Sequence, residues 1–182
     1  MPLDEPRWWY DPGARLMPLL LQPAAWVYGQ VAVSRYRRVQ PYRPHLPVIC
    51  VGNLVAGGAG KTPFALLLAR RLLQGGARPV FLTRGYGGRE RGPRLVDQNR
   101  DSACDVGDEP LLLARAAPTV VAADRAAGAR LIESLDATHI VMDDGLQNPT
   151  IAKDLSFAVI DGERWIGNGR VIPAGPLRAP LA

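Results

Sequence analysis

Three glycines, a lysine and a threonine in the segment VGNLVAGGAGKTP, residues 51–63, have the spacing of a phosphate-binding loop. Glycine lets backbone N–H groups turn toward phosphate oxygens, and a helix that begins near Gly60 directs its positive end at the same anion. Lys61 offers a point charge for the β- and γ-phosphates, and Thr62 offers a hydroxyl for Mg²⁺. We therefore predict that ATP with Mg²⁺ binds to Val55, Ala56, Gly57, Gly58, Ala59, Gly60, Lys61 and Thr62.

The loop departs at one position from the usual pattern G-x-x-x-x-G-K-[ST], because Val55 stands where the pattern has its first glycine. That position needs only a compatible turn, and two glycines follow it closely. A glycine-rich turn without a ligand is the alternative. The apolar strand expected before the loop and the helix expected after it favour a nucleotide site.

An acidic pair closes the apolar segment IVMDDG, residues 140–145. A strand that ends in aspartate beside a phosphate-binding loop places a carboxylate near the metal ion. We expect Thr62, Asp143 and Asp144 to hold Mg²⁺, and Asp144 to act in catalysis together with Lys61. A simple acidic turn at a strand end is the alternative.

The segment GDEP, residues 107–110, places Asp108 and Glu109 at the start of a helix. The helix dipole favours carboxylates there, so a purely structural role stays open. In the functional interpretation, Asp108 accepts or orients the proton of an attacking hydroxyl.

The segment RGYGGRERGPR, residues 84–94, has four arginines against one glutamate. Arginine binds anionic groups through paired hydrogen bonds, so we expect Arg84, Tyr86 and Arg89 to contact an anionic substrate. A solvated flexible loop is the alternative. No nucleic-acid recognition module accompanies the loop, so we expect no nucleic-acid partner.

Composition indicates a soluble globular protein with an acidic partner. The chain has 182 residues, 47% hydrophobic and 21% charged, and a formal net charge of +5. The excess of positive charge favours nucleic acid, an anionic membrane surface or a phosphorylated substrate as the partner. Cys50 and Cys104 have neither disulfide-framework nor metal-ligand spacing.

Alternating apolar strands and helices predict an α/β fold, a P-loop NTPase-like parallel sheet flanked by helices. Ligands of such sheets bind at the carboxyl ends of the strands, where the glycine loop, the arginine-rich loop and the acidic pair all fall. We expect strands at 47–52, 78–83, 118–123, 138–144 and 155–161, and helices at 61–74, 107–117 and 124–135.

The N-terminal region reads as a helix that lies on a membrane surface. Residues 16–34 carry no charge, but their prolines, glutamines and glycine argue against a membrane span. Tryptophans lie around this stretch and arginines follow it, as in interfacial helices. A helix packed on the domain's own core is the alternative. We divide the chain into a docking segment with a proline-rich linker, 1–46, and a P-loop kinase domain, 47–182.

In this order the motifs resemble the tetraacyldisaccharide 4'-kinase family, the lipid A 4'-kinases. The resemblance covers most of the chain, and the valine in the loop is a family feature. It rests on VGNLVAGGAGKTP (51–63), LTRGYGG (82–88), VGDEP (106–110), DDGLQN (143–148) and GNGRVIPAGPLR (167–178).

The resemblance implies a kinase that transfers the γ-phosphoryl group of ATP to the 4'-hydroxyl of a tetraacylated disaccharide 1-phosphate, a lipid A precursor. It implies peripheral attachment to the cytoplasmic face of the bacterial inner membrane. Lys61 and Thr62 match the phosphate and Mg²⁺ positions, Asp108 the catalytic aspartate, and Asp143 with Asp144 the acidic pair. From the last motif we expect Asn168 and Arg170 to contact substrate.

The chain departs from the family at Asn148, where the family usually has histidine, and at Ala179, where it usually has glutamate. Family members are longer, and the histidine that pairs with the catalytic aspartate lies in their C-terminal part. We therefore expect this chain alone to bind ATP and to be weakly active or inactive in catalysis. Because residues 163–182 are loop-like, we expect this chain to be the front part of a longer protein. A membrane-associated ATPase switch of the MinD type and a nucleotide-binding pseudokinase fragment are the alternative functions.

Overall fold

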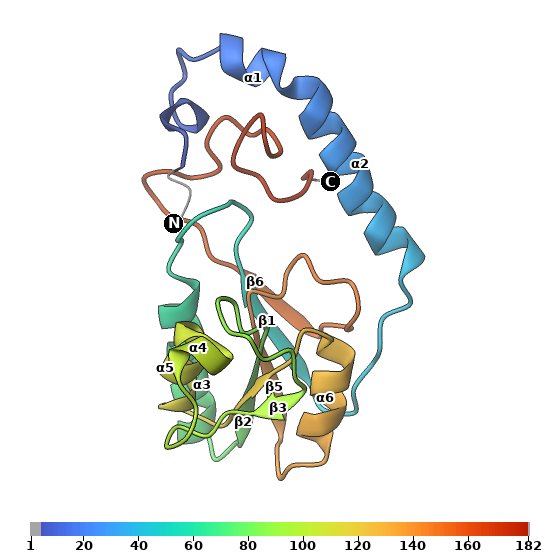
Figure 1. Cartoon of the computed structure of the whole chain (residues 1–182), viewed down its shortest axis with the longest axis vertical. Helices are drawn as coiled ribbons and strands as arrows, with labels where there is room; N and C mark the ends of the chain where they lie inside the picture. The colour runs from blue at the N-terminus through green and yellow to red at the C-terminus, as the bar shows by residue number, and fades with distance from the viewer. Residues whose placement is uncertain (1–4, 182) are drawn as a thin grey trace. The chain divides into compact units, whose positions relative to one another are not determined.

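A computed structural model describes residues 5–181, which form two compact units. The first unit contains residues 5–39, 53–60 and 158–181, and the second contains residues 40–52 and 61–157. The α-helices and strands of both units are labelled in Figure 1.

A six-stranded sheet forms the centre of the second unit (Figure 1). The strand order is β3-β4-β2-β5-β1-β6, and β5 pairs in parallel with both β1 and β2, as β2 does with β4. The parallel sheet expected from the apolar segments is thus confirmed. The strands are β1 (Val48–Gly52), β2 (Pro79–Thr83), β3 (Arg94–Leu95), β4 (Thr119–Val121), β5 (His139–Asp143) and β6 (Leu155–Ala158).

Helices cover both faces of this sheet, as the continuous burial of β1 and β2 requires. Helices α3 (Lys61–Gln74), α4 (Ala103–Val106) and α5 (Asp108–Ala114) lie on one side, and α6 (Arg125–Glu133) lies on the other (Figure 1). Because side chains alternate along a strand, Cys50, Leu82 and Met142 pack with Ile132 of α6 in one cluster. Val51, Phe81 and Val141 of the same strands are also fully buried.

Two local features differ from the sequence-based expectations. The helix expected at 107–117 is α5, which runs from Asp108 to Ala114, and the short helix α4, which was not expected, precedes it. Gly107 separates the two helices because its φ of 93° cannot occur inside a helix. The end of the arginine-rich segment is the short strand β3, which pairs antiparallel with β4. The pattern of the segment gave no sign of this strand, because two residues are too few to show alternation.

Gly128 allows α6 to approach the sheet. A Cβ at this position would lie 2.5 Å from Leu82 Cδ1 and 2.7 Å from Ala122 Cβ. We expect Gly128→Ala to destabilise the chain by about 1–2 kcal/mol, because overpacking outweighs the higher helix propensity of alanine. Urea denaturation measures the change. Gly162→Ala, which would meet no atom within 4 Å, is the matched control and should change stability by less than about 0.5 kcal/mol. Equal effects of the two substitutions would contradict the packing explanation.

The first unit contains the N-terminal helices and the C-terminal loops. A turn at Leu21 separates α1 (Leu16–Leu20) from α2 (Gln22–Arg38), and Pro23 occupies the first turn of α2, where its missing N–H costs little. Before them, Trp9 of the 3-10 helix η1 (Arg7–Trp9) is buried, and its Nε1 donates to Pro173 O at 3.2 Å. Within residues 5–181, no helix has the length and apolar character needed to cross a membrane.

Candidate active site

The glycine loop, residues 53–60, belongs to the first unit and is braced from inside. Asn53 is fully buried, and its Nδ2 donates to Gly57 O at 3.0 Å. Gly57 and Gly60 have φ values of 99° and 78°, which disfavour any residue with a Cβ. A Cβ at Gly57 would also lie 1.6 Å from Glu5 Oε1, whereas one at Gly58 would meet nothing within 4 Å. The loop therefore has the left-handed turns that expose backbone N–H groups to an anion.

Val55 has a structural role that explains the missing first glycine. Its side chain is 6% exposed, and its backbone forms an antiparallel bridge with Leu177, itself 1% exposed. On either side of this bridge, Ala56 N donates to Pro176 O at 2.7 Å and Arg178 N donates to Leu54 O at 2.9 Å. The C-terminal motif thus holds the start of the glycine loop, and an extended, buried residue suits that position better than glycine.

Lys61 and Thr62, the first residues of α3 in the second unit, each contact a carboxylate. Lys61 Nζ lies 3.8 Å from Asp144 Oδ1, and the lysine side chain is only 11% exposed. Thr62 Oγ1 donates to Glu109 Oε1 at 3.1 Å. The acidic pair and the GDEP motif thus both lie beside the start of α3.

Asp143 is a buried carboxylate without a well-formed internal hydrogen bond. The residue is 1% exposed, and neither oxygen has a well-formed hydrogen bond within the described part of the chain, although the backbone N–H of Asp144 interacts weakly with the carboxylate. Burial, with repulsion from Glu109 and Asp144, raises its pKa to about 7, although Lys61 opposes the shift. A nearby cation strongly stabilises the charged form of such a buried carboxylate. Asp144 follows with a φ of 54°, so the chain turns sharply where the strand ends.

These residues are suited to bind a Mg²⁺ ion that is also coordinated by the phosphates of a nucleotide. Within residues 5–181, no three His, Cys, Asp or Glu side chains converge to hold a metal alone. Mg²⁺ needs no such cage, since it usually takes one or two carboxylates and completes its shell with water and phosphate oxygens. Asp143, Asp144 and the hydroxyl of Thr62 are the predicted ligands. Glu109 is an additional carboxylate that sequence reasoning assigned only to a helix end.

We expect Glu109→Gln to lower the pKa of Asp143, because the Glu109 charge is the second largest cause of its elevation. The change removes one negative charge and keeps the shape of the side chain. Carboxyl-carbon NMR measures the titration midpoint of Asp143. Glu163→Gln, at an exposed site, is the control and should leave the midpoint near 7. A midpoint that does not move in Glu109→Gln would contradict this electrostatic coupling.

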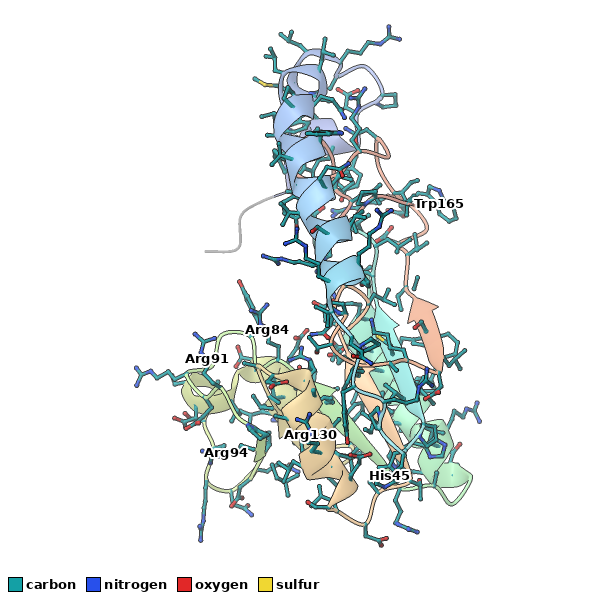
Figure 2. The ribbon with its side chains drawn as sticks, turned by 90° about the vertical axis from the view of Figure 1, so that its right-hand side faces the viewer. His45, Arg84, Arg91, Arg94, Arg130 and Trp165 are labelled. Carbon is teal, nitrogen blue, oxygen red and sulfur yellow. The ribbon has the colours of Figure 1, made fainter. Side chains whose placement is uncertain are left out.

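The arginine-rich loop begins directly after β2, and Arg84, Tyr86 and Arg89 are exposed on it. Figure 2 shows that Arg84 and Arg91 extend from this yellow-green segment. Arg94 is engaged, since its guanidinium pairs with Glu90 at 3.3 Å and with Asp101. The loop therefore offers its first arginines, rather than all of them, to an anionic ligand.

Asn168 and Arg170, the other expected substrate contacts, lie in the first unit. Asn168 Nδ2 donates to Ala174 O at 2.9 Å, and its Oδ1 accepts from Arg170 N at 3.1 Å. The Arg170 guanidinium donates to Gln22 Oε1 of α2. Both side chains therefore brace the first unit itself.

The loop after the acidic pair is held by residues that the sequence analysis did not assign. Lys153 Nζ donates to Leu146 O at 3.0 Å and to Asn148 O at 2.7 Å. Asn148 Oδ1 accepts from Thr150 N at 2.8 Å and from Thr150 Oγ1 at 2.7 Å. Asn148 thus closes a local turn in this chain, a role that requires hydrogen bonding but no titration.

The architecture and the motifs define a P-loop kinase fold. The glycine loop starts at the end of β1, α3 follows it with Lys61 and Thr62, and the acidic pair ends β5, which lies next to β1 in the sheet. Residues 17–182 match the family described as LpxK, tetraacyldisaccharide-1-P 4'-kinase. The chain belongs to this family.

Curated relatives and a solved structure agree with the family match. The chain is 58% identical to the tetraacyldisaccharide 4'-kinase of Rhodopseudomonas palustris strain BisB18, over 98% of this chain and 52% of the relative. It is 55% identical to that of Rhodospirillum centenum, over 99% of this chain and 54% of the relative. The crystal structure of the "apo" form of LpxK from Aquifex aeolicus in complex with ATP superposes with a TM-score of 0.78 and 31% identity, over 91% of this chain and 55% of that one. The chain spans about half the length of these relatives.

Proposed function

We propose that this chain binds ATP and contributes the phosphate-binding half of a kinase that phosphorylates the 4'-hydroxyl of a tetraacyldisaccharide 1-phosphate. The observation that carries the proposal is the buried Asp143 carboxylate, without a well-formed hydrogen bond, among Lys61, Glu109 and Asp144. In a member of this family, such a carboxylate is best explained as part of a site for a metal-bound nucleotide. The Aquifex aeolicus relative was crystallised with ATP.

Each residue of the site has a role in such a transfer. Lys61 neutralises charge on the β- and γ-phosphates. Thr62, Asp143 and Asp144 would hold Mg²⁺, which when bound offsets charge on the phosphate oxygens. Asp108, exposed at the first residue of α5, accepts the proton that the acceptor hydroxyl loses as its oxygen attacks the γ-phosphorus. ADP leaves with the electrons of the broken bond.

Phosphate transfer to the acceptor is the direct test. The chain is incubated with γ-³²P-labelled ATP, Mg²⁺ and the tetraacyldisaccharide 1-phosphate in detergent micelles. Labelled bisphosphorylated lipid is the expected product, and the same disaccharide with its 4'-hydroxyl methylated is the control acceptor. ATP hydrolysis without labelled lipid, stimulated instead by a protein partner, would favour the MinD-type switch. Binding of ATP without any turnover would favour the pseudokinase. The comparisons support neither alternative.

We further propose that α1 and α2 attach the protein to the cytoplasmic face of the inner membrane. These helices expose large apolar side chains, and the last turn of α2 adds three arginines that anionic lipids attract. Buried positions are few on α2, namely Ala25 and Gly29. The exposed apolar residues are Leu16, Met17, Leu19, Leu20, Trp26, Val27 and Val31.

We expect Trp26→Asp to weaken binding to vesicles of anionic phospholipid by at least about tenfold, because a large apolar side chain is replaced by a charge that anionic lipids repel. Co-sedimentation with vesicles measures the binding. Leu67→Asp, at an exposed apolar position of α3, is the matched control and should leave vesicle binding unchanged. Equal losses in both variants would show that α2 is not the attachment surface.

A further inference from the structure

Lys153 is a half-buried lysine that neither the motifs nor the proposed transfer uses. Its Nζ donates to Leu146 O at 3.0 Å and to Asn148 O at 2.7 Å. Burial lowers the pKa of Lys153, and the nearby Cys50 of β1 opposes the shift. Removing an ammonium group from water costs free energy, so a lysine is seldom buried unless its donors are used. The two carbonyls offset that cost and tie the lysine to the segment that carries them.

The two carbonyls belong to a turn that follows the acidic pair directly. Asn148 N donates to Gly145 O at 3.0 Å, which closes the turn over residues 145–148. Gly145 is the residue after Asp144, whose φ of 54° is uncommon for a residue with a side chain. Such a conformation persists only where the surrounding structure imposes it. A fixed turn directly after Asp144 is one such constraint.

Packing holds one side of this turn against the sheet. A Cβ at Gly145 would lie 2.6 Å from Met142 Cε and 3.0 Å from Cys50 Sγ. A Cβ at Gly52 would lie 2.7 Å from Leu146 Cγ, so Leu146 covers the end of β1. These contacts involve apolar groups, and they set the distance between the turn and the sheet. The backbone carbonyls of the same turn are polar and need donors instead.

Lys153 itself is fixed by the residues on either side of it. Asp154 N donates to Val48 O at 2.9 Å, and Val48 N donates to Asp154 Oδ2 at 2.8 Å. On the other side, Ala152 N donates to Tyr42 O at 2.8 Å. Because Val48 is the first residue of β1, Lys153 reaches the turn from a segment that is bonded to the sheet. Strand β1 pairs with β5, which ends in the acidic pair, so one rigid sheet carries both.

We propose that Lys153 is a positioning residue for the acidic pair, which fixes the turn at residues 145–148 and thereby keeps Asp144 in one orientation for Mg²⁺. Lys153 acts through the turn and does not contact the ligand. This inference rests on the proposed function for the identity of the ligand, a nucleotide with its metal ion. Its test measures metal binding and needs no phosphate transfer.

The test measures the affinity of the chain for Mn²⁺, a paramagnetic substitute for Mg²⁺, together with a non-hydrolysable ATP analogue. The electron paramagnetic resonance signal of free Mn²⁺ reports binding, and a titration of the analogue without protein gives the baseline. Lys153→Met keeps the apolar stem of the side chain and removes the ammonium group. It should weaken Mn²⁺ binding by at least about tenfold, the usual effect of losing a residue that orients a metal ligand. Lys153→Arg keeps donors for both carbonyls and should recover most of the affinity.

The affinity of Lys153→Met for the ATP analogue without any metal ion should equal that of the wild-type chain, because the lysine positions the acidic pair and does not bind phosphate. A purely structural role would instead lower both affinities. Arg43→Gln is the matched control, since it removes an exposed positive charge that pairs with Asp154, the residue next to Lys153. It should leave Mn²⁺ binding unchanged.

Unchanged Mn²⁺ binding in Lys153→Met overturns the proposal. A comparable loss of metal-free affinity for the ATP analogue also overturns it, because such a loss indicates a phosphate contact or a general loss of structure. If circular dichroism shows that Lys153→Met does not fold, Lys153→Gln, which keeps one donor group, carries the same test. A wild-type chain that binds Mn²⁺ with the analogue but transfers no phosphate would reject the proposed function and leave the role of Lys153 standing.

Discussion

Asp143→Asn is expected to stabilise the unliganded chain and to reduce phosphate transfer by at least about 100-fold. The carboxylate is buried without a well-formed hydrogen bond, so its charge opposes folding when no cation is bound. Asparagine has nearly the same shape and no charge, but it is a far weaker ligand for Mg²⁺. The substitution should therefore separate the stability of the fold from its function.

The stabilisation expected for Asp143→Asn depends on pH, and the raised pKa of Asp143 determines the direction of this dependence. The pKa of Asp143 is about 7 in the folded chain and has an ordinary value of 3.8 for an exposed aspartate. Between these values the folded state binds more protons than the unfolded state, so stability falls as pH rises from about 4 to 7. At pH 8 the wild-type chain should be less stable than Asp143→Asn by roughly 2–4 kcal/mol, and at pH 4 the difference should largely vanish.

Urea denaturation at several pH values measures this prediction, without nucleotide or metal ion. Asp136→Asn is the control, because its side chain is 86% exposed and should show no comparable dependence on pH. Adding Mg²⁺ with ATP should reverse the order, since a cation stabilises only the chain that retains the carboxylate. If Asp143→Asn were less stable than wild type at pH 8, burial of the charged carboxylate would not destabilise the folded chain, and the prediction would be wrong.

Lys61→Ala is expected to reduce kcat/KM for phosphate transfer by about 100- to 1,000-fold, the usual effect of removing one preorganised charged donor from a transition state. The lysine side chain is almost buried and lies 3.8 Å from Asp144. Its loss should also raise the pKa of Asp143 further, because Lys61 is the cation that lowers it. Steady-state kinetics and the Asp143 titration measure the two effects.

Arg70→Ala is the matched control for Lys61→Ala, since it removes an exposed cation from the same helix α3. It should leave both kcat/KM and the Asp143 midpoint unchanged. Lys61→Arg should recover the midpoint but little of the rate, because guanidinium keeps the charge and changes the geometry. A rate in Lys61→Ala close to that of wild type would contradict the role of Lys61 in phosphate binding.

The bounds of the long apolar helix and strands could be predicted closely from the sequence. The helix expected at 61–74 is α3 with the same bounds, and the strands expected at 47–52 and 78–83 begin one residue later than predicted. A strand that is buried on both faces requires a continuous run of apolar residues. Such a run is a local property, so it can be recognised in the sequence. The short helix α4 and the short strand β3 were not predicted, because four and two residues are too few to show a helical or strand period.

The motifs of the expected site could be recognised in the sequence, but several contacts of their residues could not. Lys61, Thr62 and the acidic pair follow recognisable patterns of chemistry. Glu109 looked like an ordinary helix-end charge until α5 placed it against Thr62. Lys153 belongs to no motif, and only its bonds to the carbonyls of the turn after the acidic pair single it out. Val55 was expected to be harmless, and the structure adds that it is a buried bridge to Leu177.

Residue types and their spacing were enough to indicate the α/β class, the phosphate-binding loop and the acidic strand end, because these depend on glycine flexibility, side-chain charge and local periodicity. Which carboxylate is buried without a well-formed hydrogen bond, which lysine holds the turn after the acidic pair, and what holds Val55 could be learned only from the folded chain. Desolvation and pairing depend on groups that are far apart in sequence, and no local pattern encodes them.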